Sequence, residues 1–265
     1  MNEAILGGLL EGGTDPMEIV ATVRRAERAA ELAERHTGIT AIAGSEEPDN
    51  NKQAAKAAGI VILGVKPVGI AELAREISGS LAPDAIVISV AAAVSIAQLE
   101  AALPAGQPVI RTMPNTPAKL GRGVVSVSPG TNCSPEQLQR AKDILGAVGT
   151  VVEIPEEQVD ALSAISGSGP AYAFYLAEAM AAAGVELGLD EELALLLARE
   201  TVAGAGLMLA EPGAEPAALR KAVTSPNGTT ERAIATFDDR GMPAIIAAGA
   251  RAAADRAAEI TKQLG

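Results

Sequence analysis

The stretch VTSPNGTTERA, residues 223–233, combines small polar residues with the start of a predicted helix. Ser225, Thr229 and Thr230 carry hydroxyl groups, and Gly228 leaves the neighbouring backbone N–H groups accessible. Free N–H groups, hydroxyls and the positive end of a helix dipole together favour bound anions, so the stretch predicts a pocket for a carboxylate. Clusters of this kind also serve as plain helix N-caps, and the residues alone leave that interpretation open.

Two further segments place polar residues at the predicted ends of buried strands. Lys66 in GVKP, residues 64–67, follows a continuous apolar run, and Asn115 lies between two prolines in RTMPNTPA, residues 111–118. Ligands of open α/β sheets bind at the carboxyl ends of strands, and a rigid loop there can hold a side chain toward a ligand. A solvated lysine at a strand end and a simple turn around Asn115 are the alternatives.

Arg24 and Arg25 end a strand-like run, MEIVATVRR, at residues 17–25. In a dinucleotide-binding domain this strand end faces the adenosine ribose, where an acidic residue accepts a hydrogen bond from the 2′-hydroxyl of NAD. Two arginines instead complement the 2′-phosphate of NADP through charge-assisted hydrogen bonds. The pair therefore favours NADP, although solvated surface arginines give the same pattern.

The first 155 residues alternate strands and helices of the lengths found in βαβ units, which predicts an α/β fold with a parallel sheet covered on both faces. We expect strands at residues 17–25, 38–43, 60–67, 85–91, 108–112, 123–128 and 150–154, and helices at 26–36, 50–59, 68–77, 95–103 and 135–148. Beyond Pro155 the chain is rich in Ala and Leu, with a helical pattern only. The sequence thus predicts a Rossmann-like, doubly wound domain over residues 1–155 and an all-helical domain over 156–265.

The chain opens on a predicted helix, MNEAILGGLLEGG, at residues 1–13. In a doubly wound nucleotide domain, a strand and a Gly-x-Gly-x-x-Gly turn stand before the first helix, and the turn holds the cofactor pyrophosphate. The sequence contains no such turn. We therefore expect a sheet that lacks its first strand.

Composition argues against several classes of function. The net charge of −12 and the near absence of aromatic residues argue against a nucleic-acid partner. Charged residues interrupt every apolar stretch before the roughly 18 residues that a membrane span needs, and the N-terminus does not resemble a signal peptide, so we expect a cytoplasmic protein. One cysteine, Cys133, and one histidine, His36, leave no disulfide, no multi-His or multi-Cys metal site and no His-based triad.

In order and spacing, GVKP, RTMPNTPA, ISGSGPAYAF (residues 165–174) and VTSPNGTT resemble the pyrroline-5-carboxylate reductases, over essentially the whole chain. These enzymes reduce a cyclic imine, 1-pyrroline-5-carboxylate, to proline with NADPH or NADH. For the cofactor, the resemblance implies contacts from Arg24, Arg25, Asn51, Val65, Lys66, Pro67, Ala92 and Asn115. For the substrate carboxylate it implies a loop of Ser225, Gly228, Thr229 and Thr230, with the Thr230 hydroxyl bonded to the ring nitrogen.

One substrate-loop residue departs from the family pattern, because Asn227 stands where family members usually carry glycine. Asparagine is the residue that next best tolerates a left-handed backbone, so we expect the loop geometry to be kept. The resemblance also implies an intertwined homodimer, in some members assembled into a decamer. The predicted helices at residues 170–188 and 190–211 are apolar on more than one face, which favours burial against a partner chain.

Members of the family carry a first strand and a glycine-rich turn before the position that matches Met1. Either the start lies at an internal methionine of a longer protein, or the chain is shortened. We favour the first, because loss of a central parallel strand leaves backbone groups without partners and uncovers apolar surface.

Hydride transfer to C5 of the imine suits this set of residues, because the substrate can arrive protonated as an iminium and then needs no strong general acid. Two other functions remain open at this stage. A non-catalytic oligomerisation or binding protein derived from the reductase would explain the missing turn. A β-hydroxyacid dehydrogenase has a similar two-domain build, but it carries a catalytic lysine on the helix that here reads AYAFYLAEAM, residues 171–180, without lysine.

Overall fold

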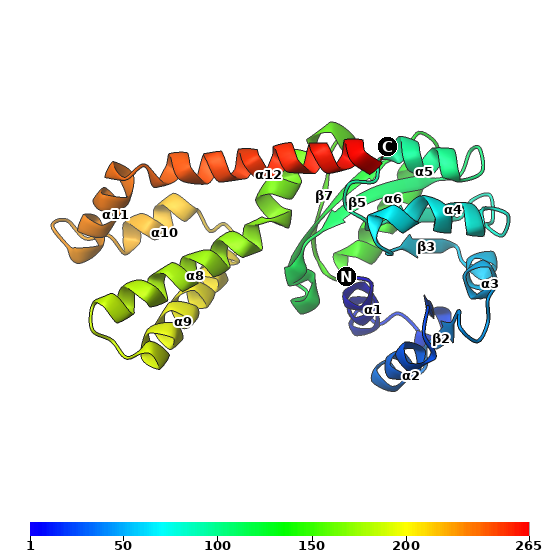
Figure 1. Cartoon of the computed structure of the whole chain (residues 1–265), viewed down its shortest axis with the longest axis horizontal. Helices are drawn as coiled ribbons and strands as arrows, with labels where there is room; N and C mark the ends of the chain where they lie inside the picture. Colours follow the sequence, from blue (N-terminus) through cyan, green and yellow to red (C-terminus); the bar gives the residue numbers. More distant parts are fainter. Residues whose placement is uncertain (265) are drawn as a thin grey trace. The chain divides into compact units, whose positions relative to one another are not determined.

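The computed structural model describes residues 1–264 and divides into two compact units (Figure 1). The first unit contains residues 1–167 together with the end of the chain from Ala254, and the second contains Ser168–Ala253. The predicted boundary after residue 155, which separates a Rossmann-like domain from an all-helical domain, stays a prediction.

The first unit alternates strands and helices as the sequence predicts. Its strands are β1 (Val20–Val23), β2 (Thr40–Ala43), β3 (Ile60–Leu63), β4 (Ile86–Ser89), β5 (Val109–Pro114), β6 (Gly123–Pro129) and β7 (Gly149–Glu153). Its helices are α1 (Asn2–Glu11), α2 (Ala26–Arg35), α3 (Asn50–Ala57), α4 (Ile70–Ser78), α5 (Ile96–Ala102), α6 (Pro135–Gly146) and the short α7 (Val159–Leu162). The main local difference is a 3₁₀ turn at Pro16–Glu18, where an extended run was expected, because proline favours the first position of such a turn.

The strands form two separate sheets in the described part of the chain. β1 pairs with β2 in parallel, and β3-β4-β5-β6-β7 form a second sheet in that order. All neighbours in the second sheet are parallel except β5 and β6, which are antiparallel, contrary to the expected all-parallel sheet. Only a 3₁₀ turn, Thr116–Leu120, joins these two strands, and a parallel pair would need a crossover of about a dozen residues or more.

Helices cover both faces of the five-stranded sheet, as expected for a doubly wound fold. In β4, Val87 packs with residues of α4 and α5, whereas Ile86 and Ile88 pack on the other face with residues of α1 and α6. This alternation follows from the two-residue period of a strand. The Rossmann-like α/β architecture predicted from the sequence is therefore confirmed.

Helix α1 links the two sheets through adjacent buried residues. Ile5 belongs to the core of the five-stranded sheet, and Leu6 packs with Leu32 and Ile39 beside β1 and β2. No described residue forms a strand before β1, and β1 and β3 are not hydrogen-bonded to each other. Side-chain packing against α1 is therefore one connection between the two sheets.

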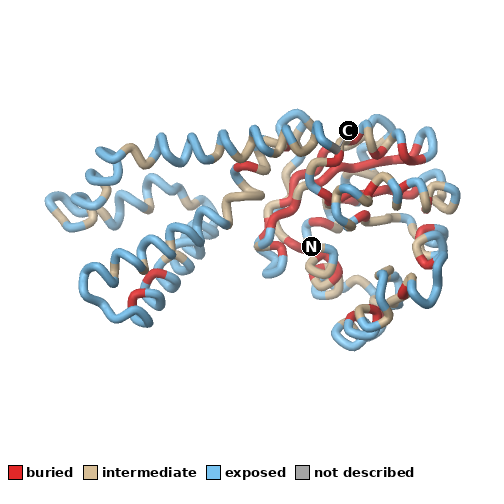
Figure 2. Tube along the Cα trace, in the orientation of Figure 1, coloured by how far each residue is buried: buried red, intermediate tan, exposed pale blue. Residues whose placement is uncertain are grey.

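The second unit is helical, with α8 (Gly169–Glu186), α9 (Glu191–Leu209), α10 (Pro216–Ala222), α11 (Thr229–Asp239) and the first part of α12 (Met242–Leu264). Large apolar side chains on α8 and α9 are exposed, among them Phe174, Tyr175 and Leu195, and Figure 2 shows both helices mostly in pale blue. Among the helices that the structure describes, none combines the length and the apolar character that a bilayer crossing needs.

Candidate functional site

The two arginines at the end of β1 are exposed and free to bind an anion. Arg24 follows the strand directly, and Arg25 precedes α2 as its N-cap residue. Within residues 1–264 neither guanidinium forms a side-chain hydrogen bond or an ion pair, whereas the backbone carbonyl of Arg24 accepts a hydrogen bond from the Ser45 N–H at 3.1 Å. The backbone at this strand end is thus fixed while the two cations remain unpaired.

Asn51 lies at the start of α3, and its side chain is already engaged. The Asn51 Nδ2 donates to Glu76 Oε1 on α4 at 3.1 Å, and the Asn51 backbone N–H donates to the side chain of Asn50 at 2.8 Å. Sequence reasoning missed Asn50, which is only 3% exposed. The residue types do not show which side chains are buried, so only the position of Asn50 next to Asn51 could have drawn attention to it.

Val65, Lys66 and Pro67 follow β3, where Pro67 opens a 3₁₀ turn and the Lys66 side chain is exposed. The start of α1 packs closely against the same strand end, because a Cβ added to Gly64 would lie 1.8 Å from Asn2 Oδ1. The predicted cofactor residues after β3 and the first helix therefore adjoin, and a side chain at position 64 would require the Asn2 side chain to move.

Ala92 is exposed in the turn after β4, and its neighbour Ala93 has a left-handed backbone with φ of 61°. Two buried polar residues stabilise the strand end before this turn. The Thr112 hydroxyl of β5 donates to the Ser89 carbonyl at 2.9 Å, and the Ala91 N–H donates to the Ser89 hydroxyl at 3.4 Å. A strained backbone held by surrounding contacts is a common feature of functional turns.

Asn115 is buried, and its amide connects three segments of the first unit. The Nδ2 donates to the Ser166 carbonyl at 2.9 Å, and the Oδ1 accepts from the Val124 N–H of β6 at 2.9 Å. The side chain predicted to contact the cofactor thus holds the loop after β5 against β6 and the residues before the second unit. Its role at the cofactor stays a prediction.

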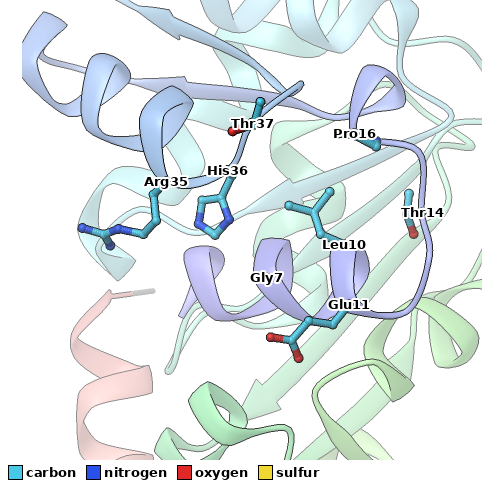
Figure 3. A pocket seen from close by; sticks show the side chains of 8 residues that line it. All are labelled: Gly7, Leu10, Glu11, Thr14, Pro16, Arg35, His36 and Thr37. Carbon is cyan, nitrogen blue, oxygen red and sulfur yellow. The ribbon is translucent and has the colours of Figure 1, made fainter.

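A cavity beside α1 contains none of the predicted site residues. It has a volume of about 540 Å³ and lies at the ends of α1 and α2 (Figure 3), lined by Gly7, Leu10, Glu11, Thr14, Pro16, Arg35, His36 and Thr37. Beside it, Glu3 forms ion pairs with Arg28 and Arg35. Among residues 1–264, no group of three His, Cys, Asp or Glu side chains is arranged to hold a metal ion.

The predicted carboxylate loop forms a tight turn in the second unit. Gly228 is the N-cap residue of α11, its N–H donates to the Ser225 carbonyl at 3.0 Å, and a Cβ added to it would lie 2.4 Å from Ser225 Oγ. Thr229 and Thr230 open the helix, and neither hydroxyl has a hydrogen-bond partner among the described residues. These hydroxyls and the helix N-terminus suit an anion.

Asn227 has a φ of 59°, so the expected left-handed backbone is confirmed. Its N–H donates to Glu231 Oε2 at 2.7 Å, which ties the turn to the first turn of α11. The structure thus brings Ser225, Gly228, Thr229 and Thr230 into one turn. The cofactor residues named above belong to the first unit and this loop belongs to the second.

Comparison with known proteins places most of the chain in a single family. Residues 156–260 match the family model described as "Pyrroline-5-carboxylate reductase dimerisation", and residues 1–93 match "NADP oxidoreductase coenzyme F420-dependent". A pyrroline-5-carboxylate reductase of Corynebacterium melassecola is 41% identical over 265 residues, which cover 99% of this chain and 96% of the relative.

Solved structures show the same likeness. A pyrroline-5-carboxylate reductase from Coxiella burnetii superimposes with a TM-score of 0.90 at 34% identity and covers 98% of this chain and 94% of its own. The Plasmodium falciparum enzyme, solved with NADP bound, has a TM-score of 0.80 at 22% identity, again over 98% and 94% of the two chains, which shows a shared fold.

Proposed function

The chain belongs to the family of pyrroline-5-carboxylate reductases, and we propose that NADPH is the source of the hydride with which it reduces 1-pyrroline-5-carboxylate to L-proline. The match to a curated reductase at 41% identity over 99% of the chain is the observation that carries this function. It disfavours the β-hydroxyacid dehydrogenase and the non-catalytic binding protein that the residues alone left open.

Arg24 and Arg25 support NADPH over NADH. Their guanidinium groups are exposed and unpaired in the described part of the chain, at the strand end that faces the adenosine ribose in dinucleotide domains. A 2′-phosphate accepts bidentate hydrogen bonds from guanidinium groups, which the 2′-hydroxyl of NADH cannot match. Asn51, Val65, Lys66, Pro67, Ala92 and Asn115 complete the proposed cofactor side. The family model matched by residues 1–93 is also named for NADP.

The turn from Ser225 to Thr230 holds the substrate in this proposal. The substrate carboxylate takes its hydrogen bonds from the Ser225 and Thr229 hydroxyls and from the N–H groups at the start of α11. The Thr230 hydroxyl then bonds to the ring nitrogen and orients the C=N bond so that C5 receives the hydride. Because the imine arrives protonated, these residues need to orient it and to stabilise charge, and no strong acid is needed.

We also propose that the chain acts as a homodimer formed through its helical unit. The exposed apolar side chains of α8 and α9 need a covering surface, and residues 156–260 match a dimerisation model. The family resemblance extends this to a decamer built from dimers, and a solution mass measurement separates the two assemblies.

Turnover with Thr230→Ala tests the proposed site. The chain itself should oxidise NADPH in the presence of 1-pyrroline-5-carboxylate. The variant should lose about tenfold to a hundredfold in kcat, because a group that orients the reacting bond acts mainly in the transition state. Thr236→Ala is the matched control, because Thr236 lies on the same helix and its hydroxyl donates to the Arg232 carbonyl at 2.9 Å. Full turnover of Thr230→Ala at saturating substrate would remove the role of Thr230.

A further inference from the structure

Asn50 is a buried side chain whose amide connects the ends of two strands. It is 3% exposed, and its Nδ2 donates to the carbonyl oxygens of Val23 at 3.3 Å and Ile42 at 3.1 Å. Val23 is the last residue of β1, and Ile42 is the last but one of β2. Its Oδ1 accepts from the Asn51 N–H at 2.8 Å. Both ends of the amide are therefore used, and its orientation is fixed.

The position of Asn50 bears directly on the two arginines. The Val23 carbonyl, immediately before Arg24, accepts from Asn50 and also from the Gly44 N–H at 2.8 Å. The next carbonyl, that of Arg24, accepts from the Ser45 N–H at 3.1 Å. The start of α3 and the loop after β2 thus hold the backbone that carries Arg24 and Arg25, while the guanidinium groups themselves have no partner among the described residues.

We propose that Asn50 is a positioning residue for the 2′-phosphate of NADPH, which it serves by holding the end of β1 so that Arg24 and Arg25 converge on one anion. This inference rests on the proposed function, and specifically on the arginine pair as the phosphate-binding group. Cations fixed in advance bind a phosphate more tightly than cations that must be ordered on binding. NADH lacks this phosphate, so Asn50 strengthens the binding of NADPH and leaves the binding of NADH unaffected.

The test is a comparison of both cofactors with Asn50→Ala in the full chain. We expect the KM for NADPH to rise about tenfold, the scale of effect of losing the hydrogen bonds of a buried amide. The KM for NADH should stay within about twofold and kcat should be unchanged with either cofactor, because only the phosphate contact depends on the arginine pair. A loss caused merely by lower stability would affect both cofactors alike.

Gln107→Ala is the matched control. Gln107 is also a buried side-chain amide, 4% exposed, and its Nε2 donates to two backbone carbonyls, those of Ala82 at 3.1 Å and Ala85. These residues stand before β4 and β5, away from the carboxyl end of β1. Its removal should lower the unfolding temperature to a similar extent and leave the ratio of the two KM values as it is. Asn50→Ser, which keeps one donor, replaces the alanine variant if that variant does not fold.

Equal changes in the two KM values, or no change in either, would overturn the role of Asn50. The double variant Arg24→Ala/Arg25→Ala separates this failure from failure of the proposed phosphate site. If the double variant loses its preference for NADPH and Asn50→Ala keeps it, only the positioning role fails. If the double variant keeps the preference while turnover continues, the phosphate site fails and the role of Asn50 fails with it. Absence of turnover in the unaltered chain would reject the reductase activity itself.

Discussion

Arg111 and Glu156 form an ion pair in which the guanidinium Nη1 lies 2.8 Å from the carboxylate Oε1, although 45 positions separate them in the chain. The same oxygen accepts from the Ile96 N–H at 2.7 Å. Arg111 is buried in β5, so one carboxylate connects that strand, the start of α5 and the segment after β7. Neither residue stood out in the sequence.

Glu156→Gln should lower the free energy of unfolding by about 2–3 kcal/mol, because the neutral amide leaves a buried guanidinium without its counter-charge. Urea unfolding followed by circular dichroism measures the change. Glu157→Gln is the control, since Glu157 is the exposed neighbour and forms no ion pair among the described residues. A loss no larger than that of the control would show that the pair adds nothing to stability.

Ala93→Gly should stabilise the chain by about 0.5–1 kcal/mol. Ala93 has a φ of 61°, a conformation that costs an L-residue about 1–2 kcal/mol and that glycine adopts freely, less the entropy that glycine loses on folding. The same change at Ala97, an exposed position inside α5, should instead destabilise by about 1 kcal/mol. In thermal unfolding we expect the unfolding temperature to rise for Ala93→Gly and to fall for Ala97→Gly. Destabilisation by both changes would contradict the prediction.

Glu3 makes stability depend on acid pH. Burial raises the pKa of this carboxyl, but the hydrogen bonds and charges of Arg28 and Arg35 outweigh that effect and hold its pKa below the ordinary 4.5. A carboxyl with a lower pKa in the folded chain stabilises the fold above its unfolded-state pKa. That stabilisation is lost as the pH falls through the lower, folded-state pKa.

Unfolding free energies measured from about pH 6 down to about pH 3 should therefore fall more steeply for the unaltered chain than for Glu3→Gln. Glu11→Gln, an exposed change on the same helix, should follow the unaltered chain. Parallel pH profiles for Glu3→Gln and the unaltered chain would show that Glu3 and its two arginines do not contribute to the pH dependence of stability.

Gly228→Ala should lower kcat/KM for 1-pyrroline-5-carboxylate by about tenfold or more. The added Cβ would lie 2.4 Å from Ser225 Oγ and 2.9 Å from the Ser225 carbonyl, so the turn that presents Ser225 and Thr230 must change shape. Gly79→Ala, where a Cβ meets nothing within 4 Å, should leave kcat/KM unchanged. Unaltered kinetics in Gly228→Ala would argue that this turn does not bind the substrate.

Local patterns in the sequence predicted the order of strands and helices in the first unit. Ser134 and Gln137 form a capping box at the start of α6, and the continuous apolar run of β4 gives a strand buried on both faces. These features depend on residues at most a few positions apart, which is why the residue types reveal them. The substrate turn was predictable for the same reason, since Ser225 to Thr230 are contiguous.

Contacts between residues that are far apart in the sequence could not be predicted from local patterns. Asn115 was identified as a loop residue, but its bonds to Val124 and Ser166 depend on how β5, β6 and the segment after α7 pack. The antiparallel direction of β6 likewise arises from a connection too short for a crossover. Local propensity carries no information on such partners, because they are set by chain reversal and packing.

The sequence by itself determined the order of strands and helices, the α/β class and the family, because periodicity, caps and contiguous motifs are local properties of the chain. Only the tertiary structure decided that α1 joins the two sheets through Ile5 and Leu6, that Arg111 finds Glu156, and that Asn50 holds the strand end beside Arg24. A buried polar group needs a partner from elsewhere in the fold, and the fold alone supplies it.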